Sequence, residues 1–466
     1  MADKKQIVEN PAYTAQKAYY KLWGDFCDGG DRIEGNDNYL PKHPYESPNQ
    51  YKIRKALATY KNHARPIVTV FTSSVWRKKP DRKELPKDLE PYLKNVDNLG
   101  TSADMFFRTV DQKAAERGVH FILVDATKAP NGAEIKTQKD SKKFNIRPYL
   151  VPVSALNLVD WGFDDNGLSY IVIQEQRDVK TDPFTSAEKE KKYKIWYRDR
   201  WEEWEDKGKD GLSLKDSQTH PCGEVPIVPV YYKKNTEMVG ESCIADIVSI
   251  LSRAYNLENA LDKSLFDTAF PQQAFFGFSK EEVEGYIKAS SNGLVASNHE
   301  ADSKFIEPEG RAYHALDKKI KNDEVSIREI ALRMIRPDSK VGESAEAKRI
   351  DNQQLHSQLS VFSQNCQDAE VRCWQIMQKW LNTKADKIEI DYNDDFDVEK
   401  ISGDLLRAFS DMRRNKDISR ETFLKALTKS EFPFPDDFDV DAELEKIESD
   451  LQSGKTMGNI GEQFLT

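Results

Sequence analysis

Few residues of this sequence are arranged in a way that supports catalysis or metal binding. His220, Pro221 and Cys222 could suggest a thiol–imidazole pair, but the sequence HPCG is more typical of a turn. The aspartates between residues 391 and 397 are spaced like the start of a calcium loop. That loop needs glycine at its sixth position and glutamate at its twelfth, which here is Ser402. Both patterns are therefore interpreted as structural.

Motifs of nucleotide-dependent and hydrolytic enzymes are missing as well. The sequence contains no GxxxxGK[ST], no GxSxG and no HExxH. Its cysteines are scattered and form no CxxC pair, which argues against a zinc site and a disulfide framework; they are Cys27, Cys222, Cys243, Cys366 and Cys373. The sequence predicts a protein that is not an enzyme, with no catalytic residue, no cofactor and no metal site.

Two basic clusters remain as candidates for contact with nucleic acid. The first is WRKK at residues 76–79, followed by Arg82 and Lys83. The second is RPDSKVGESAEAKR at residues 336–349, which combines cations with proline, glycine and small side chains. The first is also compatible with a solvated helix end and the second with an ordinary connection between two helices, so the surrounding elements must decide between these interpretations and nucleic-acid contact.

Composition limits the possible partners of this chain of 466 residues. Its net charge is −10, and the acidic excess is concentrated in residues 384–466, which contain 21 acidic and 12 basic residues. An acidic protein is not expected to coat nucleic acid, although it can let nucleic acid slide past. No apolar run approaches the length of a membrane span, and the N-terminus does not resemble a signal peptide. We therefore expect a protein of the cytosol.

The pattern of apolar residues predicts an α+β chain. Helices are expected at residues 12–29, at 47–76 with Ser47 or Asn49 as the cap, and at 101–118. Residues 119–206 predict one mixed sheet of several antiparallel strands, and the proline-rich stretch HPCGEVPIVPVYY predicts an extended edge.

Helices dominate the second half of the sequence. A helix is expected after Gly240, then an αβ insert of about 45 residues, and a second helix at 313–335. A very long helix is predicted at 344–381, because its apolar residues alternate at spacings of four and three; they are Leu355, Leu359, Phe362, Cys366, Ala369, Cys373, Ile376 and Trp380. A strand, KIEIDYN, and an acidic helical tail complete the chain.

This order of elements, together with several short stretches, resembles the portal proteins of tailed bacteriophages, the head-to-tail connectors. The stretches are VFTSSVWRKKP, TSADMFFR, GVHFILVD, RPYLVPVSALNLVDW, HPCGEVPIVPVYY and SAEAKRID. The resemblance implies an α+β portal fold with a mixed-sheet wing, paired stem helices, a small αβ clip, a long wing helix and a helical crown. It also implies a ring, usually of twelve copies, around a channel for double-stranded DNA.

The resemblance also implies a division of the chain. The wing, with a helical N-terminal part and a β-rich part, spans 1–239. The remaining parts follow in chain order: first stem helix 240–265, clip 266–312, second stem helix 313–335, tunnel loop 336–349, long wing helix and strand 350–401, and crown with C-terminal tail 402–466.

Roles for single residues follow from the same resemblance. The tunnel loop would line the DNA channel through Arg336, Ser339, Lys340, Lys348 and Arg349. Candidates for channel-facing residues of the stem are Lys318, Lys319, Lys321 and Arg328. Implied partners are the terminase motor, the major capsid or scaffold protein, and head-completion or tail adaptor proteins, with no membrane. The implied location is the portal vertex of the virion, after assembly in the bacterial host cytoplasm.

Two other functions compete with a DNA conduit. One is a nucleic-acid enzyme of the same packaging machine, which would need the missing nucleotide motif and an acidic metal cluster. The other is a monomeric scaffold or adaptor without DNA contact. The mass of the purified protein under native conditions distinguishes a ring from a monomer.

Overall fold

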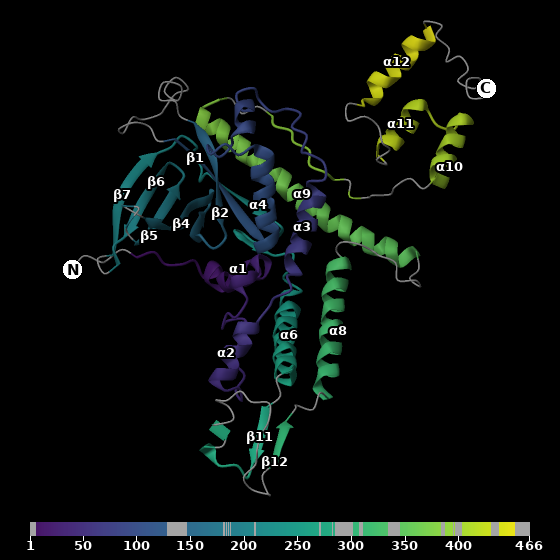
Figure 1. Ribbon diagram of the computed structural model, residues 1–466. Coiled ribbons are helices and arrows are strands. Elements are labelled where there is room, and N and C mark those ends of the chain that lie inside the picture. Colours follow the sequence, from purple (N-terminus) through teal and green to yellow (C-terminus); the bar gives the residue numbers. More distant parts are fainter. Residues whose placement is uncertain are drawn as a thin grey trace. The chain divides into compact units, whose positions relative to one another are not determined.

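The fold is known from a computed structural model of the whole chain (Figure 1). It describes residues 6–127, 147–179, 182, 184, 186, 188–208, 211–269, 272–281, 283–284, 302–306, 311–333, 345–383, 387–394, 396, 403–429 and 438–452. The chain divides into two compact units, Met1–Asp394 and Asp395–Thr466. No helix in the described ranges has the length and apolar character needed to cross a membrane.

Four α-helices come before the first strand. They are α1 (Pro11–Asp28), α2 (Pro48–Leu57), α3 (Ala64–Val75) and α4 (Ala103–Arg117), with short 3-10 helices at Gly30–Arg32 and Glu90–Lys94. Ser47 caps α2 in a capping box with Gln50, and Ser102 caps α4. Helix α4 buries Phe106 and Val110, whereas Met105 is 65% exposed.

The prediction of one helix over residues 47–76 is wrong, because the chain breaks between α2 and α3. The backbone of Thr59 is bound by the Asn259 side chain, which accepts from its N–H at 3.1 Å and donates to its carbonyl at 3.4 Å. The N–H of Tyr60 donates to Glu34 at 3.0 Å. These tertiary bonds replace helical ones, and Pro66 in the first turn of α3 needs no donor there.

The β-rich region forms two main antiparallel sheets, not the single mixed sheet that was predicted. In the first, β1 (Val119–Ala126) lies between β2 (Pro148–Ser154) and β8 (Ile227–Tyr231), so the proline-rich stretch is an edge strand as expected. The second has the order of β3 (Leu158–Asp164), β4 (Gly167–Val179), β5 (Glu188–Tyr197), β6 (Arg200–Asp206) and β7 (Leu212–Thr219). A tight turn after Ser154 leads the chain from one sheet to the other.

Helix α9 (Ala345–Leu381) packs its predicted stripe against the first sheet and the N-terminal helices. Seven of the eight stripe residues are buried: Leu359, Phe362, Cys366, Ala369, Cys373, Ile376 and Trp380. The side chain of Leu355 lies outside the described residues. The indole N–H of Trp380 donates to the carbonyl of Val124 in β1 at 2.9 Å. The heptad spacing thus marks a core face, confirming the predicted long helix.

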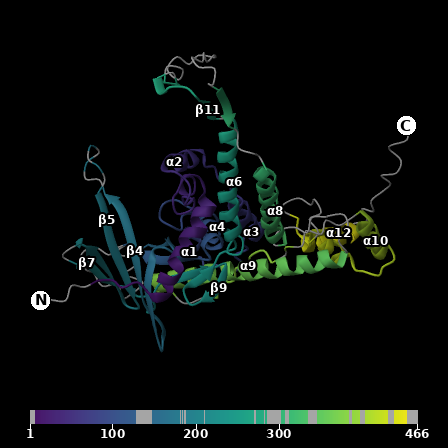
Figure 2. The same ribbon diagram turned by 90° about the horizontal axis from the view of Figure 1, so that it is seen from below.

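Two further helices of the first unit, α6 and α8, form an antiparallel pair. Helix α6 (Val248–Ala269) leads to β11 (Gln272–Phe276), which pairs with β12 (Asp302–Ile306), and α8 (Arg311–Arg333) then returns beside α6 (Figures 1 and 2). The helix predicted after Gly240 begins only at Val248. Before it, β9 (Lys233–Thr236) pairs with β10 (Val239–Glu241), and a Cβ on Gly240 would lie 2.2 Å from the Gly118 carbonyl oxygen.

The second unit contains α10 (Gly403–Arg414), α11 (Arg420–Lys429) and α12 (Val440–Gln452). Among its described side chains, Leu427 is the one apolar residue that is buried.

The prediction of a strand at KIEIDYN, near the end of the first unit, is also wrong. Residues 387–393 make only an isolated antiparallel bridge between Asp391 and Asp81. Next to this backbone bridge, the Lys83 side chain binds the Asp391 carboxylate at 2.6 Å.

Candidate functional site

The helix pair α6–α8 is held together by a charge cluster in its interface. Arg253 of α6 donates from Nε and Nη2 to the two carboxylate oxygens of Asp323 on α8, at 2.9 and 2.8 Å. Lys319, one turn before Asp323, reaches the same carboxylate at 3.0 Å. Asp323 is 1% exposed, while the Arg253 and Lys319 side chains are each half exposed. One buried carboxylate therefore joins two cations that keep contact with water.

The pKa of Asp323 and the burial of its apolar neighbours both indicate that this carboxylate is an interface residue bound by the two cations. The Arg253 guanidinium beside Asp323 holds the pKa of that carboxyl below its usual range, and Lys319 adds to the effect. Ile320 and Ile327, which flank Asp323 at spacings of three and four, are also buried. An acidic residue inside an apolar helix stripe signals a buried partner, and this signal in the sequence was missed.

Further polar contacts stabilise the pair. Lys61 binds Glu258 of α6 at 3.0 Å and Glu324 of α8 at 3.3 Å. Towards the β11–β12 end, the Tyr313 hydroxyl bonds Thr268 and donates to the carbonyl of Ser264 at 3.2 Å. The pair is thus braced along its length by contacts between its helices and the preceding chain.

Helix α6 is also anchored to the N-terminal segments. The Tyr255 hydroxyl donates to the carbonyl of Ile33 at 3.0 Å, and the Asn256 amide donates to the carbonyl of Tyr39 at 2.9 Å. Tyr255 is 1% exposed. These bonds join the helix pair to the body of the first unit.

All four predicted stem cations on α8 are exposed. They do not act alike, because Lys319 is engaged by Asp323 and Lys321 binds Asp317 at 2.7 Å. Within the described part of the chain, Lys318 and Arg328 make no ion pair. Among the described side chains of α8, Lys318 and Arg328 are therefore exposed without an ionic partner, and Lys321 is exposed beside its partner Asp317.

The predicted tunnel loop falls largely outside the described residues, which include neither Arg336 nor Ser339 and Lys340. Lys348 and Arg349 belong to the first turns of α9, so they stand on a helix and not in a loop. Their side chains are outside the described residues.

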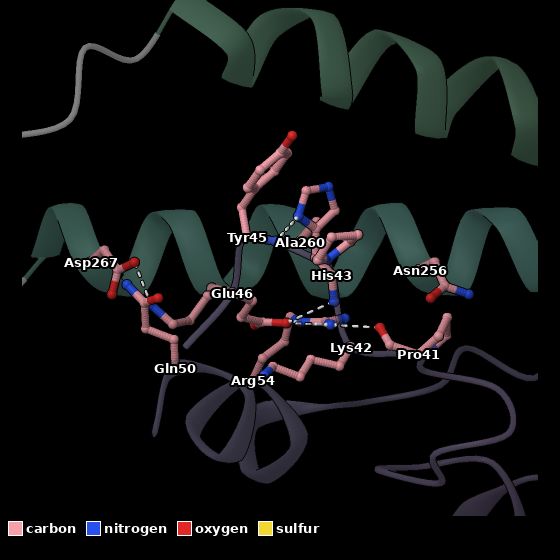
Figure 3. A pocket seen from close by; sticks show the side chains of 12 residues that line it. Pro41, Lys42, His43, Tyr45, Glu46, Gln50, Arg54, Asn256, Ala260 and Asp267 are labelled. Carbon is pink, nitrogen blue, oxygen red and sulfur yellow. Dashed lines mark hydrogen bonds and ion pairs between the residues drawn. The ribbon is translucent and has the colours of Figure 1, made fainter. Parts of the chain in front are cut away.

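On the side of α6 away from α8, a groove of about 570 Å³ separates it from α2 and residues 41–46 (Figure 3). Its floor is the buried pair of Arg54 and Glu46, whose bidentate bonds measure 2.9 and 2.8 Å. At its rim, the Tyr45 side chain is 93% exposed. The helix pair thus presents two different surfaces on its two sides, the α2 groove and the outer face of α8.

Part of the first basic cluster has a structural role. Arg82 donates to Glu370 of α9 at 2.7 Å and to Asp104 of α4 at 2.7 Å, and its own side chain is only 12% exposed. Trp76 donates its indole N–H to buried Asp111 of α4 at 2.8 Å, and Lys83 binds Asp391. These contacts hold Trp76 and Arg82 against the helices, whereas Lys78 and Lys79 are exposed.

The HPCG sequence is also structural. The His220 ring lies between the rings of Trp196 and Trp380, with centroids 5.5 and 5.6 Å away, and its Nε2 bonds the Tyr197 carbonyl at 3.0 Å. Burial lowers the pKa of His220 and raises the pKa of the buried Cys222 thiol. A thiol that resists ionisation is a poor nucleophile.

Comparisons with known proteins place weak constraints on this chain. Residues 244–381, which hold α6, α8 and α9, match a family described as a domain of unknown function, DUF4055. No curated protein matches the sequence. The chain is similar to a neck structure of a native gene transfer agent particle with C12 symmetry, at 12% identity and TM-score 0.40, covering 78% of this chain and 89% of that one.

Two further structures give similar values. A chain of the native gene transfer agent virion has 12% identity and a TM-score of 0.42, over 84% of this chain and 96% of the other. A chain of the empty particle neck with C6 symmetry has 9% identity and a TM-score of 0.37, over 85% and 97%. At these scores the matches assign no role to this chain.

Proposed function

We propose that this chain is the portal subunit of a phage-like particle, a non-enzymatic structural protein that forms a ring at one capsid vertex. The observation that carries the proposal is the antiparallel pair α6–α8, joined at one end by the β11–β12 hairpin and followed by the 37-residue α9. This order agrees with the portal resemblance of the sequence, in which a stem carries the clip and the tunnel loop precedes the long wing helix.

Each part of the chain then has a proposed role. Residues 1–239 form the wing, 240–265 and 313–335 the stem, 266–312 the clip, and 336–349 the tunnel loop. Residues 350–401 return to the wing as its long helix and following segment, and 402–466 form the crown and tail. The clip would meet the terminase motor during packaging and the tail or adaptor proteins later, and capsid or scaffold protein would surround the ring.

The α2 groove fits a head-to-tail contact between copies. A ring closes when one surface binds a different surface on the next copy, whereas a two-fold dimer needs one self-complementary surface. The α2 groove with Tyr45 lies on the side of α6 away from α8, so a contact there leaves the outer face of α8 free to face a channel (Figures 1 and 2). The proposal places the α2 groove of each copy towards its neighbour.

Native mass spectrometry tests the ring directly. The parent protein is expected at about 640 kDa, twelve times the chain mass of 53.5 kDa. Tyr45→Asp is expected to shift most of the protein to smaller species, because exposed tyrosines often anchor protein interfaces and a charge would have to be desolvated there.

Leu99→Asp is the matched control, since Leu99 is 88% exposed on a loop before α4. It should leave the ring intact. A monomeric parent protein would contradict the ring and favour the scaffold function, whereas intact rings in Tyr45→Asp would remove only the α2 groove from the contact.

Duplex DNA is proposed to pass the outer face of α8 and the tunnel loop. Neutralising Lys318, Lys321 and Arg328 together with glutamine should leave rings intact and weaken DNA binding. Each lost phosphate contact should make the slope of log affinity against log salt shallower by about 0.9. Fluorescence anisotropy of a labelled duplex at several salt concentrations measures this slope.

Lys52 and Lys207 provide the control, because both are exposed and lie outside α8 and the α2 groove. Their replacement by glutamine should leave the salt slope unchanged. If the salt slope became equally shallow in both variants, DNA would bind without preference for the proposed channel side.

A further inference from the structure

A second cationic site lies outside the helix pair, in a cavity of about 640 Å³ beside the C-terminal half of α9. Arg372 and Lys379 of α9 line it, together with Arg198 from the connection between β5 and β6. The side chains of Arg372, Lys379 and Arg198 are 44%, 42% and 28% exposed, respectively. Arg372 and Lys379 are seven residues apart and so stand on one face of the helix.

Glu224 shows which chemistry this cavity accepts. Lys379 binds one of its carboxylate oxygens at 3.0 Å, and Arg372 binds the other. Arg198 donates from its two terminal nitrogens to Asp164, at 2.8 and 2.5 Å. Three cations thus face two carboxylates, which leaves one positive charge.

The lining favours a peptide over a rigid polyanion. Besides the cations it includes the apolar side chains of Leu168, Val225 and Ile227, of which the last two are buried. A Cβ on Gly223, beside Glu224, would meet no atom within 4 Å, so the turn leaves room for a ligand. Cations beside apolar side chains suit a flexible peptide that carries both acidic and apolar groups.

We propose that this cavity binds an acidic peptide segment of a partner protein. A carboxylate of the peptide takes the place of Glu224 between Arg372 and Lys379, or joins it there, and Arg198 accepts a second acidic group. Glu224 acts as an internal counter-ion that keeps the empty site neutralised and weakens binding by competition. The site is independent of the proposed channel, so a failed peptide titration would leave ring formation and DNA contact untouched.

Titration of the full-length protein with a labelled hexaglutamate peptide tests the site. The parent should show saturable binding that weakens with salt. Glu224→Gln should bind at least tenfold more tightly, because the competing carboxylate is gone. The double variant Arg372→Gln/Lys379→Gln should bind at least tenfold more weakly. Lys52→Gln/Lys207→Gln, which removes two exposed lysines outside the cavity, should match the parent.

The response to Glu224→Gln separates a binding site from a brace. If these ion pairs only fixed the turn, the variant would lower the melting temperature without tightening binding, and that result would overturn the proposal. Affinities that are equal in all four proteins, or undetectable, would also overturn it. Pyrophosphate and a short DNA duplex are titrated in parallel. If either reproduces the pattern of the variants while hexaglutamate does not, the ligand is a phosphate compound or DNA and the peptide assignment is wrong.

Discussion

Removing both cations from Asp323 is expected to open the helix pair α6–α8. In the double variant Arg253→Ala/Lys319→Ala, a carboxylate that is 1% exposed would lose both ionic partners. Leaving a buried charge unpaired costs up to about 3–5 kcal/mol, and less here, because truncating two half-exposed side chains lets water reach Asp323. Each single variant should cost less, because the other cation remains. Hydrogen exchange of α6 and α8 should therefore rise much more in the double variant than in either single one.

Two further variants make this prediction specific. Adding Asp323→Ala to the double variant should recover part of the loss, because the buried charge is then gone as well. Lys321→Ala breaks an exposed pair on the same helix and should change stability by less than about 0.5 kcal/mol. If the double variant behaved like Lys321→Ala, the cluster would not hold the pair together.

Local patterns in the sequence predict some parts of this fold, whereas other parts depend on residues that are distant in sequence. The core face of α9 was predictable because its apolar spacing of four and three is local information. The break between α2 and α3 was not, since it depends on Asn259, two hundred residues away. The division into two sheets likewise depends on pairings that alternation along one strand does not specify.

Buried charges were the part of the site that sequence patterns could have revealed. Asp323 lies between Ile320 and Ile327 in α8, and Glu370 lies between Cys366 and Cys373 in α9, all of them buried. Spacing identifies such residues but not their partners. Arg82, which binds Glu370, is 288 residues away in sequence and looked like part of a solvated basic run.

Asp111 is a third acidic residue of this kind, and its surroundings differ from those of Asp323 and Glu370. It is 1% exposed in α4 and accepts from the Trp76 indole at 2.8 Å. The other titratable groups near it are Cys366 and Glu370 of α9 and Tyr392. Burial raises the pKa of Asp111 to about 7, despite its hydrogen bonds.

This raised pKa predicts a loss of stability towards alkaline pH. An unfolded aspartate ionises near pH 4, whereas folded Asp111 keeps its proton until about pH 7. Between these values the folded state binds more protons, so stability falls by about 1.4 kcal/mol per pH unit and levels off above pH 7. Asp111→Asn has no proton to lose. From pH 5 to pH 8 the parent should therefore lose about 2–3 kcal/mol more than the variant, as measured by urea denaturation.

Glu370→Gln is the control, because the two buried carboxyls should respond with opposite sign. Glu370 accepts from Arg82, from the Trp374 indole at 2.9 Å and from the Tyr392 hydroxyl at 2.7 Å, so its negative charge is neutralised and bonded. Losing that charge should destabilise the protein at pH 8, since Arg82 would remain largely buried without its main partner. Asp111→Asn should stabilise it at the same pH, because burying an ionised carboxylate without a cation is unfavourable. If Asp111→Asn destabilised the protein at pH 8 as Glu370→Gln does, Asp111 would be ionised and paired in the fold, and the predicted alkaline loss would be wrong.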